Sequence, residues 1–106
     1  MGITKAEVFN DQQNKMARYA KAFAHPARVA IIEYLVKAEA CICGDLVGEL
    51  PLAQSTISQH LKELKNIGII TGEIEGPRIN YCINEKAWAE ARSMLGKLMD
   101  SYKKCC

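Results

Sequence analysis

The chain has 106 residues, of which 49% are hydrophobic and 25% charged, a balance typical of an ordinary folded domain and unlike a disordered or fibrous chain. Its 14 Lys and Arg against 12 Asp and Glu leave a net charge of +2, so any surface that binds a polyanion must arise from local clustering. The first residues lack the apolar stretch of a signal peptide, and no run approaches the ~18 apolar residues that span a membrane, so we expect a cytoplasmic protein.

The amino-terminal third of the chain predicts two helices. Thr4 and Glu7 have the spacing of a capping box, and apolar residues follow at helical intervals, so a first helix is expected over about residues 4–24. Pro26 suits the first turn of a second helix, because its missing N–H would be unpaired there anyway. The predicted core positions of this second helix are Val29, Ile32, Leu35 and Val36.

A helix-turn-helix is predicted over residues 44–66. Its first helix runs from about Gly44 to Leu50, where Pro51 stops it. The second helix runs from Gln54 to Asn66, and Gly68 supplies a left-handed stop. This second helix is amphipathic, with an apolar face formed by Ile57, Leu61 and Leu64.

The last third predicts a β-hairpin followed by a long helix. Alternating apolar residues flank a turn at residues 75–78, so a hairpin is expected over about residues 69–84. Asn84 can cap a helix over residues 85–104, whose apolar stripe is Trp88, Ala91, Leu95, Leu98 and Tyr102. The stripe could belong to the core of one subunit. A chain this small buries only about two-thirds of its unfolded surface, however, so we expect the stripe to contact a second subunit.

The order of these elements predicts a mainly α fold with a small β-hairpin, a winged helix-turn-helix that occupies residues 1–106 as a single DNA-binding domain. Ser55, Thr56 and Gln59 are the expected base readers, because hydroxyl and amide side chains on the first turns of such a helix can reach base edges. The full set of expected DNA contacts is Ser55, Thr56, Ser58, Gln59, His60, Lys62 and Arg78. Alternatively, the polar face is only solvated, His60 is a packed histidine, and Arg78 is an ordinary turn cation.

The sequence resembles the ArsR/SmtB family of bacterial metal-responsive repressors. The resemblance is carried by AFAHPARVAIIEYL (22–35), CICGDLVGELPLAQSTISQHLKELKNIGII (41–70) and EGPRINYCIN (75–84), with an S-x-x-S-x-H-L pattern at Ser55, Ser58, His60 and Leu61. It implies a homodimer joined by the first and last helices and bound to a palindromic double-stranded operator. It also implies release by an inducer, with no cofactor required for DNA binding.

Five cysteines in a reducing compartment favour metal or redox chemistry over a disulfide framework. Some members of the family bind arsenite or antimonite through thiols near Cys41 and Cys43, although Gly44 departs from the arsenic-sensing pattern. Cys105 and Cys106 are candidates for the missing third thiolate, and such a site selects As(III), Sb(III) or another thiophilic ion. The family's zinc site on the last helix is expected to be absent, because residues 86–104 contain no histidine. Cys82 is expected to be a bystander.

Several readings remain open. Cys41 and Cys43 could be two packed small residues, and Cys105 and Cys106 could belong to a disordered tail. The signal could be oxidation of paired thiols, or there could be no ligand at all. The domain could also contact protein and not DNA. An enzyme is not expected, because the two histidines have separate structural roles and no acid–base cluster accompanies them.

Overall fold

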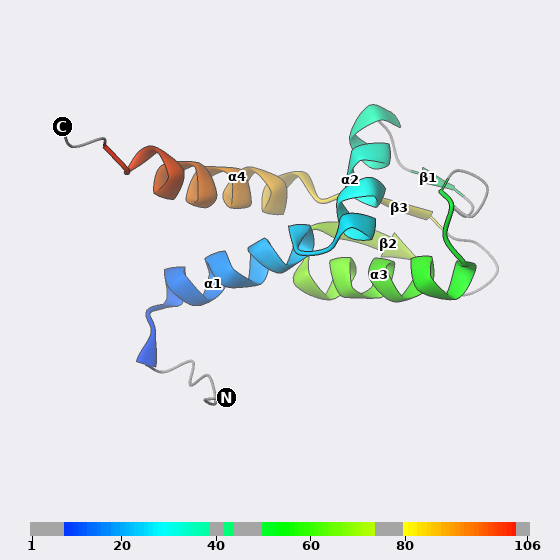
Figure 1. The fold of residues 1–106 in the computed structure, drawn as a ribbon, viewed down its shortest axis with the longest axis horizontal. Helices are drawn as coiled ribbons and strands as arrows, with labels where there is room; N and C mark the ends of the chain where they lie inside the picture. Colours follow the sequence, from blue (N-terminus) through cyan, green and yellow to red (C-terminus); the bar gives the residue numbers. More distant parts are fainter. Residues whose placement is uncertain (1–7, 39–41, 44–49, 74–79, 104–106) are drawn as a thin grey trace.

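The computed structural model describes residues 8–38, 42–43, 50–73 and 80–103. In chain order the elements are α1 (Asp11–Ala20), the 3-10 turn η2 (Lys21–Phe23), α2 (Pro26–Ala38), β1 (Ile42–Cys43), α3 (Gln54–Ile67), β2 (Ile70–Glu73), β3 (Asn80–Ile83) and α4 (Glu85–Asp100). Figure 1 shows α2, α3 and the sheet packed together, with α1 and α4 extending from them toward the same side. The predicted fold class, mainly helical with a β-hairpin, is confirmed.

The first helix is shorter than predicted. The sequence predicts a helix over about residues 4–24, whereas α1 spans Asp11–Ala20. Asn10 caps α1, because its side chain accepts from the Gln13 N–H at 2.7 Å while the Gln13 side chain accepts from the Asn10 N–H at 3.0 Å. The expected capping residues Thr4 and Glu7 lie outside the described residues. The chain tightens into η2 after Ala20, so the prediction of a regular helix to about residue 24 is wrong for its last turn.

Helix α2 begins where the sequence predicts, but the side of the helix that is buried differs from the predicted side. The His25 ring caps the helix, since Nδ1 accepts from the Ala27 N–H at 3.0 Å. Ile32 and Leu35 are buried as predicted, whereas Val29 is half-buried and Val36 is 50% exposed. Burial instead follows the four-residue spacing of Ala27, Ile31 and Leu35, and this leaves Val36 about 100° around the helix from Leu35.

The sheet has a strand that the sequence analysis did not predict. β2 and β3 form the expected antiparallel hairpin, with Ile70 opposite Ile83 and Glu73 opposite Asn80. β1 pairs with the other edge of β3, so the strand order is β1-β3-β2. Most of the first helix predicted for the helix-turn-helix, over residues 44–50, lies outside the described residues.

A single apolar cluster joins the helices to the sheet. None of the buried side chains in the described part of the chain is polar in character apart from the tyrosine hydroxyls. Fully buried members of the cluster are Ala22, Ile31, Leu64, Ile69 and Tyr81. Within the described segments, we find no helix with the length and apolar character needed to cross a membrane.

Candidate nucleic-acid interface

Helix α3 is amphipathic in the way the sequence predicts. Ile57, Leu61 and Leu64 are at most 4% exposed and anchor the helix in the core. The opposite side of the helix carries short polar groups and one lysine, and the exposed residues there include Ser55, Thr56, Gln59 and Lys62. Ser58 and His60 are half-buried at the two borders of this face. The helix therefore presents hydrogen-bonding side chains from a rigid, buried base.

The amino-terminal end of α3 favours a negative partner. Its capping residue is Ala53, which makes no side-chain hydrogen bond, and the first turn contains no acidic residue. The positive end of the helix dipole is therefore not balanced by a nearby carboxylate of this turn. At the other end, Gly68 adopts the left-handed conformation with φ of 99°, and its N–H donates to the Leu64 carbonyl.

Arg18 of α1 holds the carboxyl-terminal end of α3. Its Nη2 donates to the Asn66 carbonyl, and its Nε donates to the Ile67 carbonyl at 3.4 Å. These carbonyls belong to the last turn, where backbone acceptors have no partner within the helix. The contact fixes α3 relative to α1, which is one of the two helices expected to form the dimer.

Arg28 of α2 holds α3 near its centre, and sequence reasoning missed it. Nε donates to His60 Nδ1 at 3.3 Å, Nη1 donates to the Lys21 carbonyl at 2.6 Å, and Nη2 lies 3.9 Å from Glu63 Oε2. The Arg28 side chain is only 17% exposed. One planar guanidinium thus joins η2, α2 and α3 through different nitrogens.

His60 combines features of both predicted roles. Its ring is half-buried and lies against the ring of His25, with centroids 4.6 Å apart. Burial, followed by the nearby His25 and Arg28, lowers the pKa of His60, while Glu63 opposes this effect. The neutral ring is therefore favoured, and His60 as a residue stays partly exposed.

The predicted thiol site falls almost wholly outside the described residues. Cys41, Cys105 and Cys106 lie there, as does Arg78 of the hairpin turn, and Cys43 is described only through its backbone in β1. That backbone is extended, which is the geometry that the metal prediction required of the Cys43 segment. In the part of the chain that is described, no three His, Cys, Asp or Glu side chains are grouped to hold a metal ion.

Cys82 departs from expectation. It lies on β3 opposite Thr71 of β2, and it is disulfide-bonded. The sequence predicts that Cys82 is a bystander, because alternation along the strand places it on the opposite face of the hairpin from Tyr81 and Ile83. The disulfide gives Cys82 a bonded partner, so that prediction is wrong for this structure.

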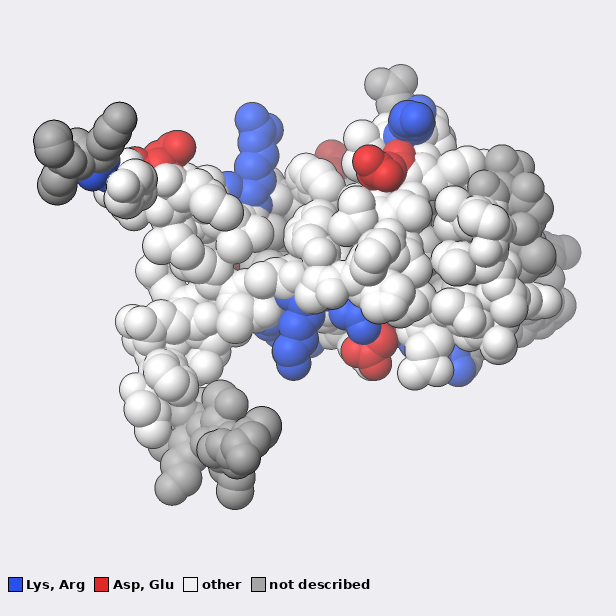
Figure 2. Space-filling model, in the orientation of Figure 1, with Lys and Arg blue, Asp and Glu red and all other residues white. Residues whose placement is uncertain are grey.

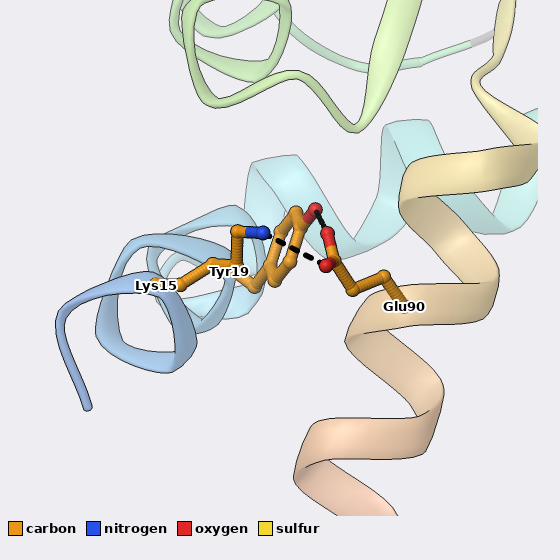
Figure 3. A network of polar contacts seen from close by, with 3 residues as sticks. All are labelled: Lys15, Tyr19 and Glu90. Atoms are coloured by element: carbon orange, nitrogen blue, oxygen red, sulfur yellow. Dashed lines mark hydrogen bonds and ion pairs between the residues drawn. The ribbon is translucent and has the colours of Figure 1, made fainter. Parts of the chain in front are cut away.

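A polar network joins α1 to α4 (Figure 3). The Tyr19 hydroxyl donates to Glu90 Oε1 at 2.5 Å, and Lys15 Nζ lies 2.8 Å from Glu90 Oε2. The bonds from Lys15 and Tyr19 lower the pKa of Glu90, and the bond to Glu90 raises the pKa of Tyr19. The carboxylate is thus held charged between two residues of the neighbouring helix.

Apolar side chains are exposed along the same two helices. Most of the face seen in Figure 2 is formed by uncharged residues. At the start of α4, Phe23 and Trp88 meet edge to face, with centroids 6.1 Å apart, and line a groove with Ala91 and Leu95. The exposed large apolar residues near α1 and α4 are Val8, Phe9, Phe23, Leu98, Met99 and Tyr102. Exposed large apolar side chains of this kind are candidates for burial against another chain.

Residues 25–71, from the start of α2 into β2, match the family model described as bacterial regulatory protein, arsR family. The chain is 31% identical to the HTH-type transcriptional regulator CmtR of Mycobacterium bovis over 88 residues, which cover 83% of this chain and 71% of CmtR.

Two further relatives extend the comparison. The HTH-type transcriptional repressor SmtB of Mycobacterium tuberculosis is 41% identical over 61 residues, or 58% of this chain, and the match spans only 44% of SmtB. The crystal structure of NolR from Sinorhizobium fredii superposes on this chain with a TM-score of 0.61 at 25% sequence identity. The superposition covers 99% of this chain and 100% of the NolR chain.

Proposed function

The chain belongs to the ArsR family of bacterial regulatory proteins, and from that premise we propose that it is a transcriptional repressor that binds operator DNA through α3. A regulatory protein of this family is not an enzyme. The observation that carries the proposal is the polar face of α3. The helix itself is held in place by Arg18, which bonds to its carboxyl-terminal end, and by Arg28, which bonds to His60 near its centre. Rigid placement matters because base readout requires side chains to be fixed relative to the groove.

We assign the exposed residues of α3 by their chemistry. Ser55, Thr56 and Gln59 read base edges, because hydroxyl and amide groups can both donate and accept. Lys62 contacts phosphate as a charge, and Ser58 and His60 contact the backbone from the borders of the face. Arg78 is proposed as a backbone or minor-groove contact from the sequence alone.

We propose that a second copy of the chain covers the exposed apolar side chains of α1 and α4. Leu98 is 55%, Met99 74% and Tyr102 79% exposed on one chain, a high value for large apolar residues close together. Pairing through these helices would relate two α3 helices by a two-fold axis, with half-sites about 34 Å apart on DNA.

Selection from random-sequence duplexes tests the repressor proposal. The expected product is an inverted repeat with half-sites about 10 base pairs apart, centre to centre. Gln59→Ala is expected to relax selection at one position in each half-site, whereas the exposed Lys37→Ala on α2 should select the same sequence. Absence of any enriched sequence would contradict DNA recognition and favour a module that contacts protein.

We propose that a thiophilic metalloid, As(III) or Sb(III), releases the DNA by binding Cys41 and Cys43, with Cys105 or Cys106 as the third donor. The extended backbone of Cys43 in β1 supports this proposal, because two thiols this close in sequence can reach one ion only from an extended or turn-like segment. Stoichiometric arsenite binding that Cys43→Ser abolishes is the expected result in mass spectrometry. Equal binding by the variant would contradict the assignment.

A thiol switch is the second candidate for the signal, and the disulfide at Cys82 favours it. Cys41 is the cysteine that directly precedes β1, whose Ile42 lies opposite Tyr81, so Cys41 is the partner we expect. Peptide mapping without reductant identifies the bonded pair. Release of DNA by peroxide alone, lost in Cys82→Ser, would support the switch, whereas release by arsenite alone would exclude it.

A further inference from the structure

Arg28 has a geometry that suits a role in DNA binding without touching DNA. Its three guanidinium nitrogens contact His60 and Glu63 on α3 and the Lys21 carbonyl on η2. Resting on the proposed function, we infer that Arg28 is a positioning residue. It fixes His60 as a neutral ring whose Nε2–H is the donor for a phosphate oxygen of bound DNA.

The hydrogen bonds determine which ring nitrogen carries the proton. Arginine has only donors, so His60 Nδ1, at 3.3 Å from Arg28 Nε, must accept. The proton of the neutral ring is therefore on Nε2. His25 follows the same rule, because its Nδ1 accepts from the Ala27 N–H at 3.0 Å. Adding a proton to His60 would place an N–H against the Arg28 donor.

The surroundings of His60 make this arrangement consistent with an anionic partner. Glu63, on the same helix, would repel a phosphate, but the Arg28 guanidinium lies 3.9 Å from its carboxylate. The groups that face His60 are His25 and Arg28 from the α2 side and Glu63 from α3 itself. His60 is one turn from Thr56 and next to Gln59, so its donor borders the proposed base readers.

Nitrogen NMR of the His60 ring in the free protein tests the first half of the inference. Wild-type protein should show one tautomer, with the proton on Nε2. Arg28→Gln should give mixed tautomers and a higher His60 titration midpoint, because a neighbouring cation is removed. Lys37→Gln, which removes the same charge from the exposed far end of α2, should match the wild type. An unchanged tautomer and midpoint in Arg28→Gln would overturn the inference.

A second variant guards against loss of the fold. If Arg28→Gln does not fold, Arg28→Met answers the same question, because methionine keeps a long side chain but carries no N–H donor. Mixed tautomers in Arg28→Met would support the inference, and a single Nε2–H tautomer would contradict it.

Titration of the selected duplex at several salt concentrations tests the second half. His60→Ala should bind about tenfold more weakly. Its salt dependence should equal that of the wild type, because a neutral donor displaces no counterions. His60→Gln, which retains an N–H donor, should recover much of the affinity. Lys62→Ala, in contrast, should reduce the slope by ~0.9.

Two results separate the inference from the proposed function. A reduced slope in His60→Ala, or unchanged affinity, would overturn the role assigned to the neutral ring. If the wild-type chain binds no duplex, the proposed function fails. The nitrogen NMR spectra of the ring would then still show whether Arg28 determines the tautomer of His60.

Discussion

Replacing Gly72 by alanine should weaken the β2–β3 hairpin severely. Gly72 has φ of 121°, which L side chains rarely adopt, and an added Cβ would lie 2.1 Å from the Asn80 carbonyl oxygen and 2.8 Å from Tyr81 Cα. The dihedral strain costs about 1–3 kcal/mol. Both blocking atoms belong to the backbone of β3, so the strands must separate and lose backbone hydrogen bonds worth about 0.5–1.5 kcal/mol each.

The matched control is Gly68→Ala. Gly68 also has a positive φ, 99°, but an added Cβ there has no described atom within 4 Å, so only the conformational cost of about 1–2 kcal/mol applies. Urea unfolding at one fixed protein concentration gives both free energies of unfolding. We expect Gly72→Ala to lose about 2 kcal/mol more than Gly68→Ala. Equal losses of unfolding free energy in the two variants would show that the close approach of β3 is not the reason that position 72 requires glycine.

Three further perturbations test the contacts between helices. Arg18→Met should lower the free energy of unfolding by about 1–3 kcal/mol, because two carbonyls of α3 lose a charged donor; no loss in urea unfolding would mean that water replaces it. The pKa of Glu90 is lowered on folding, so its contribution to stability is present above pH 4.5 and declines as the pH falls through the lower folded pKa. Glu90→Gln should flatten that part of the stability–pH curve, and an unchanged curve would contradict the Lys15–Glu90–Tyr19 network. Leu98→Asp should shift the chain from dimer to monomer in sedimentation, and an unchanged mass would exclude the end of α4 from the interface.

The sequence predicts best where local chemistry decides the structure. The spacing of Ile57, Leu61 and Leu64, followed by Gly68, predicts α3 to within one residue of its observed end. Asn84 is predicted to cap the last helix, and in the structure its side chain accepts from the Ala87 N–H at 3.2 Å. In both cases residues a few positions apart carry the whole signal.

The features that were missed depend on contacts distant in sequence. β1 has only two residues, too few for any periodicity, and exists because Tyr81 and Asn80 of β3 offer it an edge. Arg28 reads as an ordinary surface arginine of α2 until α3 brings His60 and Glu63 to its guanidinium. The exposure of Val36 likewise follows from how α2 is rotated against its neighbours, and amphipathic spacing alone does not determine that rotation.

Binding of the selected duplex, compared with a shuffled duplex of the same composition over a range of salt concentrations, tests the central claim most directly. A phosphate-binding regulator predicts a steep fall of affinity with salt for both duplexes and a preference of about a thousandfold or more for the selected one. A flat salt dependence with equal affinity for the two duplexes would contradict the assignment of α3 as a DNA-reading helix.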